Sequence, residues 1–216
     1  MSRRDEIRDQ ALKDLQQHEV LMLNGHFDFG NGYHGSVYLN PHQLFRYPST
    51  IWHFAQDLLD VLPAPIVEAT EVVTGPVTGG ALLAHTMAGL LDSRRAITRP
   101  PTLFAPFTLD TDPGGLKASG SRCGHTLTRF YGRQVAGRKA LVVDDVRNTG
   151  QTQAHCAELV RKAGGHVLAT AVIYDRMEAM VDAGVPNVTL AEYKAPDNYP
   201  ADACPLCRAG MPVTTF

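Results

Sequence analysis

The sequence predicts an α/β protein in which helices cover both faces of a mostly parallel, twisted sheet. Two stretches show the same order of strand, glycine-rich turn and helix: EVVTGPVTGGALLAHTMAGLL and KALVVDDVRNTGQTQAHCAELVRKAGG. A third apolar run, HVLATAVIYDR, follows the second helix and is predicted to be a further strand. Strands that alternate with helices pair in parallel, because each helix returns the chain to the same end of the sheet.

The N-terminal part is expected to begin with an amphipathic helix and to continue with short strands. Residues 3–23 carry apolar side chains at broadly helical spacing, namely Ile7, Ala11, Leu15 and Leu23. The segment HFDFGNGYHGSVYLN combines aromatic and β-branched residues with glycines, which favours a hairpin or short strands joined by tight turns. A second helix is predicted from about residue 50 to 62, where the sequence PAP ends it.

We expect a single domain over residues 1–216, because a chain of this length buries a full hydrophobic core. Roughly residues 1–48 and the C-terminal segment are predicted to form a small hood on it. Residues 98–136 are rich in Pro, Gly, Ser and Thr with little periodicity, which predicts one long irregular segment. Loops of that length are usually functional lids or disordered.

Composition and charge exclude several classes of function. The chain has 20 Lys and Arg against 22 Asp and Glu, so its net charge of -2 provides no field that would hold a nucleic acid. The first residues are too charged for a secretory signal, and the longest apolar stretch is far too short to span a membrane. Four cysteines do not make a disulfide scaffold at this length. We therefore expect a soluble, cytoplasmic protein without a nucleic-acid or membrane partner.

Two adjacent carboxylates, Asp144 and Asp145, follow the apolar run ALVV at the predicted end of a strand. In an open α/β sheet, ligands bind beyond the carboxyl ends of the strands, where loops meet helix N-termini. The segment VRNTGQT behind the pair offers backbone N–H groups and two threonine hydroxyls to a phosphate. Carboxylates beside a phosphate suit a ligand that also presents hydroxyls or a metal ion, such as a sugar phosphate. The alternative is that the pair merely caps a helix and the segment is an ordinary turn.

The full string ALVVDDVRNTGQT resembles the phosphoribosyl pyrophosphate (PRPP) signature of the type I phosphoribosyltransferases. The resemblance implies that family's fold and a reaction in which a nitrogen base displaces pyrophosphate, helped mostly by electrostatics and positioning. It also implies that Asp144 and Asp145 hold the ribose hydroxyls, directly or through Mg²⁺, and stabilise the cation-like charge at C1. The other residues that it implies for PRPP binding are Val146, Arg147, Asn148, Thr149, Gly150, Gln151 and Thr152.

Further segments are similar to the orotate phosphoribosyltransferases, and together they span about residues 20 to 180. In the N-terminal motif, the residues that fall in register are Phe27, Gly32, Tyr38 and Asn40. VVTGPVTGGALLA resembles the family's pyrophosphate loop, which implies PRPP contacts from Gly75, Pro76, Val77, Thr78 and Gly79. VIYDR resembles the strand whose arginine grips the orotate carboxylate, so Arg176 is the implied carboxylate partner, with Tyr38 and Asn148 beside the base.

Asn148 favours a pyrimidine acceptor over a purine. In the 6-oxopurine enzymes of this class an aspartate usually stands at this place, two residues before the loop glycine, and an asparagine cannot serve as a general base. The resemblance therefore implies transfer of 5-phosphoribosyl from PRPP to orotate, giving orotidine 5′-phosphate and pyrophosphate in pyrimidine synthesis. It also implies a homodimer with active sites near the interface.

Three departures from the orotate pattern keep other functions open. Gly30 and Gly79 stand where lysines are frequent, and Asn31 replaces a serine. The missing cations favour a PRPP-binding regulatory protein without turnover, or a phosphoribosyltransferase for another heteroaromatic base.

Residues 110–126 are predicted to be a mobile loop that closes over PRPP, because five glycine and proline residues leave it many conformations. The family's corresponding loop carries lysines and a His-Gly pair, which makes Lys117, Arg122 and His125 catalytic candidates here, with Lys117 the first choice. The alternative is that Lys117 and Arg122 are solvated loop residues.

Cys204 and Cys207 form a CxxC pair, which is half of a structural zinc site. Cys123 and His125 are candidates to complete it, or a dimer could pair two such units. The simpler interpretation, which we prefer at this point, is a C-terminal turn with buried thiols.

Overall fold

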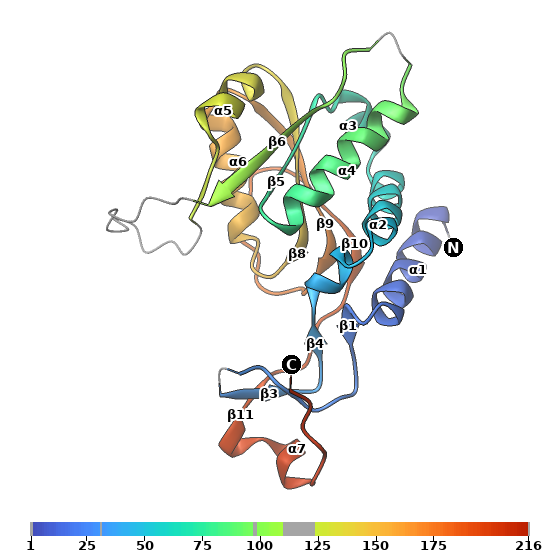
Figure 1. Ribbon diagram of the computed structural model, residues 1–216, viewed down its shortest axis with the longest axis vertical. Helices are drawn as coiled ribbons and strands as arrows, with labels where there is room; N and C mark the ends of the chain where they lie inside the picture. The colour runs from blue at the N-terminus through green and yellow to red at the C-terminus, as the bar shows by residue number, and fades with distance from the viewer. Residues whose placement is uncertain (1, 31, 97–98, 110–123, 216) are drawn as a thin grey trace.

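The computed structural model describes residues 2–30, 32–96, 99–109 and 124–215 (Figure 1). These residues form a central six-stranded sheet whose strands are parallel except for the last, which is antiparallel to its neighbour. In spatial order the strands are β10 (Asn187–Glu192), β9 (His166–Asp175), β8 (Lys139–Arg147), β5 (Val72–Pro76), β6 (Leu103–Leu109) and β7 (His125–Thr126). The predicted fold class is confirmed.

Helices cover both faces of this sheet, because the strands are apolar on both sides. One face packs against α1 (Arg3–Gln17), α2 (Pro48–Val61) and α4 (Gly79–Arg94), and the short α3 (Ala64–Ala69) leads from α2 to β5. The other face packs against α5 (Arg129–Val135) and α6 (Gln151–Lys162). Neighbouring residues of one strand therefore belong to opposite cores: Val72 packs with α5 and α6, and Val73 packs with α2 and α4.

The prediction of one irregular segment over residues 98–136 is wrong. This segment contains β6, which pairs in parallel with β5, as well as β7 and α5. Pro106 lies inside β6 and obscured the strand pattern, since proline removes a ladder donor. The strand tolerates it because, among the described residues, β7 pairs only with Thr108 and Leu109, so Pro106 lies at an edge.

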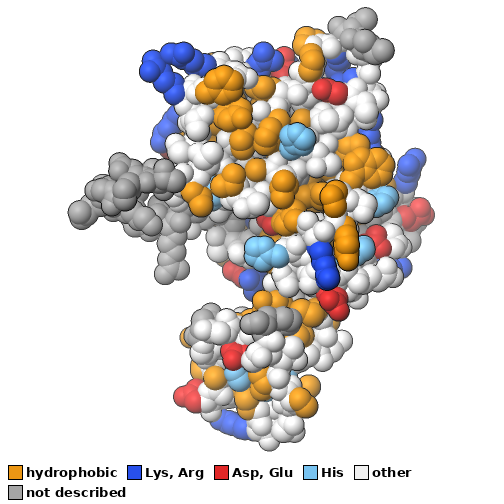
Figure 2. Space-filling view, viewed as in Figure 1, with side chains coloured by type: hydrophobic (Ala, Val, Ile, Leu, Met, Phe, Trp, Pro, Cys, Tyr) orange, Lys and Arg blue, Asp and Glu red, His pale blue; other side chains and the backbone are white. Residues whose placement is uncertain are grey.

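A small lobe stands apart from the sheet and carries the described C-terminal residues (Figures 1 and 2). We define the lobe as residues 24–30, 32–37 and 196–215. It contains an antiparallel sheet in the order β11-β3-β2, followed by a single helical turn and a short helix. These elements are β2 (Phe27–Asp28), β3 (Tyr33–Gly35), β11 (Tyr199–Pro200), η2 (Ala201–Ala203) and α7 (Pro205–Arg208).

The lobe includes less of the N-terminus than the expected hood, because α1 packs against the body. Ala11 and Leu15 of α1 are fully buried in the core that also holds α2 and β10. A two-stranded ribbon, β1 (Leu21–Met22) with β4 (Tyr38–Leu39), leads from the body to the lobe and back, and the 3₁₀ turn η1 (Pro41–Phe45) follows β4. Within the described residues, the helices are all too short or too polar to cross a membrane.

Candidate active site

Among the described residues, three adjoining cavities lie beyond the carboxyl ends of β5, β8 and β9. Their volumes are about 720, 210 and 410 Å³, and we call them the aromatic, helix-end and loop cavities. Asp145 lines both the aromatic and the loop cavity, and Asp144 lines both the helix-end and the loop cavity. The shared aspartates make the three cavities one continuous site at the edge of the sheet where such folds bind ligands.

The helix-end cavity is lined by the backbone and side chains of residues 146–153 together with Asp144. Gly150 is the N-cap of α6 and has φ +76°, a left-handed conformation that glycine adopts at little cost. No side chain caps this helix end, and its first turn contains no acidic residue. The N–H groups of the first turn and the positive end of the helix dipole therefore face the cavity and suit an anion.

Asp144 and Asp145 are held by the backbone that follows them. The amide of Asp145 donates to Oδ1 of Asp144 over 3.0 Å, and the amide of Val146 donates to Oδ1 of Asp145 over 2.9 Å. Asp144 is only 8% exposed. The carboxylates are thus oriented before any ligand arrives, which spares the cost of ordering them on binding.

The glycine-rich loop after β5 lies directly against the two carboxylates. A β-carbon on Gly79 would stand 2.3 Å from Oδ2 of Asp145, and one on Gly80 would stand 2.8 Å from Oδ1 of Asp144. Gly75 is packed beneath the loop, where a β-carbon would stand 2.2 Å from the carbonyl oxygen of Gly80. The glycines therefore permit an approach that a larger residue would prevent.

The loop cavity is formed between this loop, η1 and β7. Besides the two aspartates, its lining comprises Pro41, His42, Phe45, Pro76, Val77, Thr78, Gly79, His125 and Thr152. Burial lowers the pKa of His125 below its ordinary value; a hydrogen bond with the Val77 backbone opposes this with a smaller effect, and the still smaller influence of nearby His155 lowers the pKa again. His125 is therefore neutral at pH 7.

The aromatic cavity is lined on one side by the lobe and on the other by the ends of β8 and β9. Tyr38 stacks on Phe29 with ring centroids 6.1 Å apart, and both line this cavity. Across from them, Nη1 of Arg176 donates to Oδ1 of Asn148 over 3.3 Å. A flat ring with an acidic substituent suits such a cavity, because aromatic walls accept its faces and the guanidinium accepts its charge.

Two buried interactions support this wall. Burial raises the pKa of Tyr174 to about 12, so its hydroxyl keeps its proton and donates to the carbonyl oxygen of Tyr193 over 2.9 Å. Arg147 forms an ion pair with Asp175, and both side chains are almost fully buried. The pair joins the last residues of β8 and β9, which hold Asn148 and Arg176 at the cavity.

Comparison with known proteins identifies the family. No family model matches the sequence. A curated orotate phosphoribosyltransferase of Thermotoga petrophila is 32% identical over 202 residues, which cover 93% of this chain and 94% of the relative. The chain belongs to the orotate phosphoribosyltransferase family.

Solved structures of this family share the fold. The orotate phosphoribosyltransferase of Aeropyrum pernix superposes with a TM-score of 0.60 at 24% identity, covering 84% of this chain and 93% of that one. The Mycobacterium tuberculosis enzyme, solved in complex with PRPP, gives a TM-score of 0.51 at 15% identity and covers 88% of each chain.

The structure brings together most of the residues expected at the phosphoribosyltransferase site. The aspartate pair, the residues of the helix-end loop, the pyrophosphate loop, Tyr38 and Arg176 all lie around the three cavities. Gly75 is packed beneath its loop, and Arg147 lines the helix-end cavity while its guanidinium pairs with Asp175. Asn31, Lys117, Arg122 and Cys123 lie outside the described residues, as does most of the expected loop 110–126.

The alternative in which His125 completes a metal site with the CxxC pair does not fit the structure. His125 lies on β7 at the loop cavity, whereas Cys204 and Cys207 lie in the lobe beside His26 and His34. His125 was a candidate because it stands close to Cys123 in the sequence, but β7 is the edge strand of the main sheet and does not reach the lobe.

Several lining residues escaped the sequence analysis. Phe29 and Tyr33 line the aromatic cavity and belong to the N-terminal motif, so that motif could have predicted their place in the site. Asn198 and Ala195 come from a C-terminal segment without periodicity and reach the aromatic cavity only because β11 pairs with β3. His42 and Phe45 lie on η1, which no local pattern predicted.

Proposed function

We propose that this chain transfers the 5-phosphoribosyl group from PRPP to orotate, giving orotidine 5′-phosphate and pyrophosphate, as a cytoplasmic step of pyrimidine nucleotide synthesis. The observation that carries the proposal is the continuity of the three cavities through Asp144 and Asp145. A sugar phosphate placed at the aspartates has an anion site on one side, a second polar cavity on another, and an aromatic cavity for the acceptor.

In this proposal the 5′-phosphate binds at the N-terminus of α6. The backbone N–H groups of the helix end and the hydroxyls of Thr149 and Thr152 donate to its oxygens, as helix ends commonly do for phosphates. The ribose hydroxyls donate to the carboxylates of Asp144 and Asp145, which also stabilise positive charge as it develops at C1. The pyrophosphate group occupies the loop cavity against Val77, Thr78 and Gly79.

Orotate occupies the aromatic cavity with its ring beside Tyr38 and its carboxylate on Arg176. A guanidinium and a carboxylate form two parallel hydrogen bonds, which fixes the ring as well as holding it. A ring nitrogen then bonds to C1 while the bond from C1 to the pyrophosphate oxygen breaks, and the nitrogen's proton leaves to solvent. Asn148 orients Arg176 through its side-chain oxygen and takes no proton.

The donor set at the aspartates fits Mg²⁺, which prefers carboxylate and phosphate oxygens. Asp144 and Asp145 are the residues that would hold it, directly or through water. When bound with PRPP, the ion would neutralise charge on the diphosphate.

The pyrophosphate group needs further positive charge. Among the described residues that line the loop cavity, none is lysine or arginine, and His125 is neutral at pH 7. We propose that Lys117 and Arg122 supply this charge from the loop 110–126 of a neighbouring subunit in a homodimer. The same observation favours the second candidate function, a PRPP-binding regulatory protein that lacks turnover.

The test is the double substitution Asp144→Asn plus Asp145→Asn. Pyrophosphate release in the presence of PRPP, Mg²⁺ and orotate is expected to fall by more than about 10²-fold, because the neutral amides cannot stabilise charge at C1. The circular dichroism spectrum and melting temperature are expected to change little, since an asparagine side-chain oxygen can still accept the backbone hydrogen bonds that Oδ1 of Asp144 and of Asp145 accept. A control pair on the exposed surface of α1, Glu6→Gln plus Asp9→Asn, is expected to keep full activity. Near-normal turnover in the Asp144/Asp145 variant would reject the site.

A further inference from the structure

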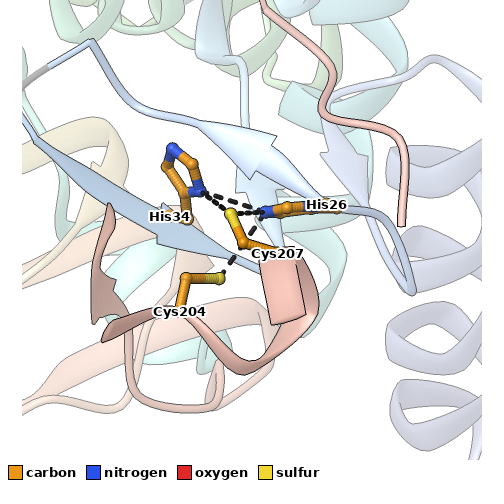
Figure 3. A group of neighbouring side chains, drawn as sticks. All are labelled: His26, His34, Cys204 and Cys207. Carbon is orange, nitrogen blue, oxygen red and sulfur yellow. Dashed lines mark hydrogen bonds between the residues drawn. The ribbon is translucent and has the colours of Figure 1, made fainter. Parts of the chain in front are cut away.

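We propose that the lobe binds a structural zinc ion through His26, His34, Cys204 and Cys207. Figure 3 shows the four side chains pointing toward one point between the β2-β3 hairpin and the start of α7. One ligand atom from each residue, two imidazole nitrogens and two sulfurs, lies within 4.8 Å of all the others. Two nitrogens and two sulfurs are a ligand set that structural zinc ions commonly take.

Four of the six distances between these atoms can be compared with those around a tetrahedral zinc ion, and they match. With Zn–N bonds of about 2.1 Å and Zn–S bonds of about 2.3 Å, tetrahedral geometry places two nitrogens about 3.4 Å apart and a nitrogen and a sulfur about 3.6 Å apart. Nε2 of His26 and Nδ1 of His34 are 3.0 Å apart. Sγ of Cys207 is 3.5 Å from Nε2 of His26 and 3.3 Å from Nδ1 of His34, and Sγ of Cys204 is 3.6 Å from Nε2 of His26. All four separations are within a few tenths of an ångström of the expected values.

The ring nitrogen that faces away from the cluster has an oxygen within hydrogen-bond distance in His26 and a carboxylate somewhat farther away in His34. Nδ1 of His26 is 2.9 Å from the carbonyl oxygen of Met211, and Nε2 of His34 is 3.9 Å from Oδ1 of Asp28. Zinc-binding histidines usually donate their second N–H to such an oxygen, which orients the ring.

Without a metal, two neutral histidines would turn one lone pair toward a carboxylate. If the Nδ1–H of His26 donates to Met211, its Nε2 is an acceptor, so His34 must present a proton on Nδ1. The Nε2 lone pair of His34 then faces the carboxylate of Asp28. A zinc ion between the rings removes this conflict, because both inward nitrogens become ligands and both outward nitrogens become donors.

The lobe also lacks the apolar core that would otherwise hold it together. Among its described residues, the buried apolar side chains are Phe27 and Cys204. Both large apolar clusters of the chain lie in the body. Segments of this size without a core usually depend on disulfides or a structural metal. His26 is 2% exposed and Cys204 1% exposed, so the cluster occupies the place of a core.

The ion would join two parts of the chain that are far apart in the sequence, with a separation of 178 residues between His26 and Cys204. His26 precedes β2 and His34 lies in β3, in the hairpin that carries Phe29 and Tyr33. The cysteines follow β11, which follows Asn198. Phe29, Tyr33 and Asn198 line the aromatic cavity. Insofar as the proposed function holds, zinc thereby fixes the wall of the orotate cavity without touching the substrate.

The first measurement is metal content. Chain expressed without a histidine tag in zinc-supplemented medium and then dialysed is expected to retain about one zinc per molecule by plasma mass spectrometry. Adding Co²⁺ to the reduced, metal-free chain is expected to give the visible bands of a tetrahedral ion and a thiolate charge-transfer band. Absence of zinc together with absence of these bands would overturn the proposal, as would stoichiometric iron or a Cys204–Cys207 disulfide in the intact mass. None of these readouts depends on activity.

Variants then assign the ligands. Cys207→Ser is expected to remove bound zinc and the charge-transfer band, whereas Cys156→Ala, which removes a buried thiol from α6, is expected to keep both. Asp28→Asn is expected to weaken zinc binding by up to about 10-fold, because it removes the negative charge that lies 3.9 Å from Nε2 of His34. Full zinc binding in Cys207→Ser would overturn the assignment, and if that variant does not fold, the cobalt spectrum of the parent chain still decides.

Discussion

At the scale of single residues, Gly79 determines how close the pyrophosphate loop comes to Asp145. The family frequently has lysine there, but a β-carbon on Gly79 would stand 2.3 Å from Oδ2 of Asp145 and 2.7 Å from Cζ of Phe45. In this chain the side chains of Asp145 and Phe45 occupy the space that a side chain at position 79 would need. A lysine could not simply be restored without moving the carboxylate that we assign to the ribose.

We expect Gly79→Ala to displace the Asp145 side chain and to lower kcat/KM for PRPP by about 10²-fold, since small misplacements of catalytic groups have effects of that size. Gly89→Ala is the matched control, because Gly89 lies in the same helix and an added β-carbon would meet nothing within 4 Å. The control is expected to keep its kinetics and to gain about 0.5–1 kcal/mol in free energy of unfolding. Equal kinetics in the two variants would show that Asp145 need not hold its observed position.

Arg176 is the residue on which acceptor choice depends. Arg176→Ala is expected to raise the KM for orotate by roughly 10- to 150-fold while the KM for PRPP stays nearly unchanged, because a lost charge-assisted hydrogen bond costs about 1.5–3 kcal/mol. Glu178→Gln is the control, since Glu178 lies 3.7 Å from Nε of Arg176 and competes with the substrate carboxylate. That control is expected to bind orotate at least as well as the parent. Equal weakening of orotate and PRPP in Arg176→Ala would argue against a carboxylate role.

At the scale of elements, β7 places His125 in the wall of the loop cavity. Burial lowers the pKa of His125 in the folded state, so below its ordinary pKa of about 6.5 the unfolded chain takes up a proton that the folded chain resists. This histidine therefore lowers stability as pH falls from about 6.5 through its folded pKa. We expect His125→Gln to make the free energy of unfolding less dependent on pH in that window, as measured by urea titrations. An unchanged pH dependence would indicate that His125 protonates freely in the fold.

The elements differ in how well the sequence predicted them. The end of β8, the aspartates and the start of α6 are contiguous, so one string of residues contains the whole helix-end cavity. β6 was missed because Pro106 hides a strand that is defined by its pairing with β5. The His26 and His34 ligands had no spacing signal, because the fold rather than the sequence places them beside Cys204 and Cys207.

At the scale of the whole molecule, the site lies between a body with two apolar cores and a lobe with almost none. The body supplies the aspartates and the helix end, and the lobe supplies aromatic residues such as Phe29 and Tyr33. The PRPP half of the site could therefore be predicted from local motifs. The part of the site that is proposed to bind the acceptor could not be fully predicted, because it depends on how a lobe without an apolar core is positioned over the sheet.

The most direct test of the account is pyrophosphate release by the parent chain with PRPP, Mg²⁺ and a panel of bases. We expect release with orotate and very little with uracil, which lacks the carboxylate for Arg176, or with purines, for which Asn148 provides no general base. Binding of PRPP without release for any base would contradict the enzymatic account and support the regulatory alternative. Release with uracil as fast as with orotate would contradict the proposal that Arg176 binds the carboxylate of the acceptor.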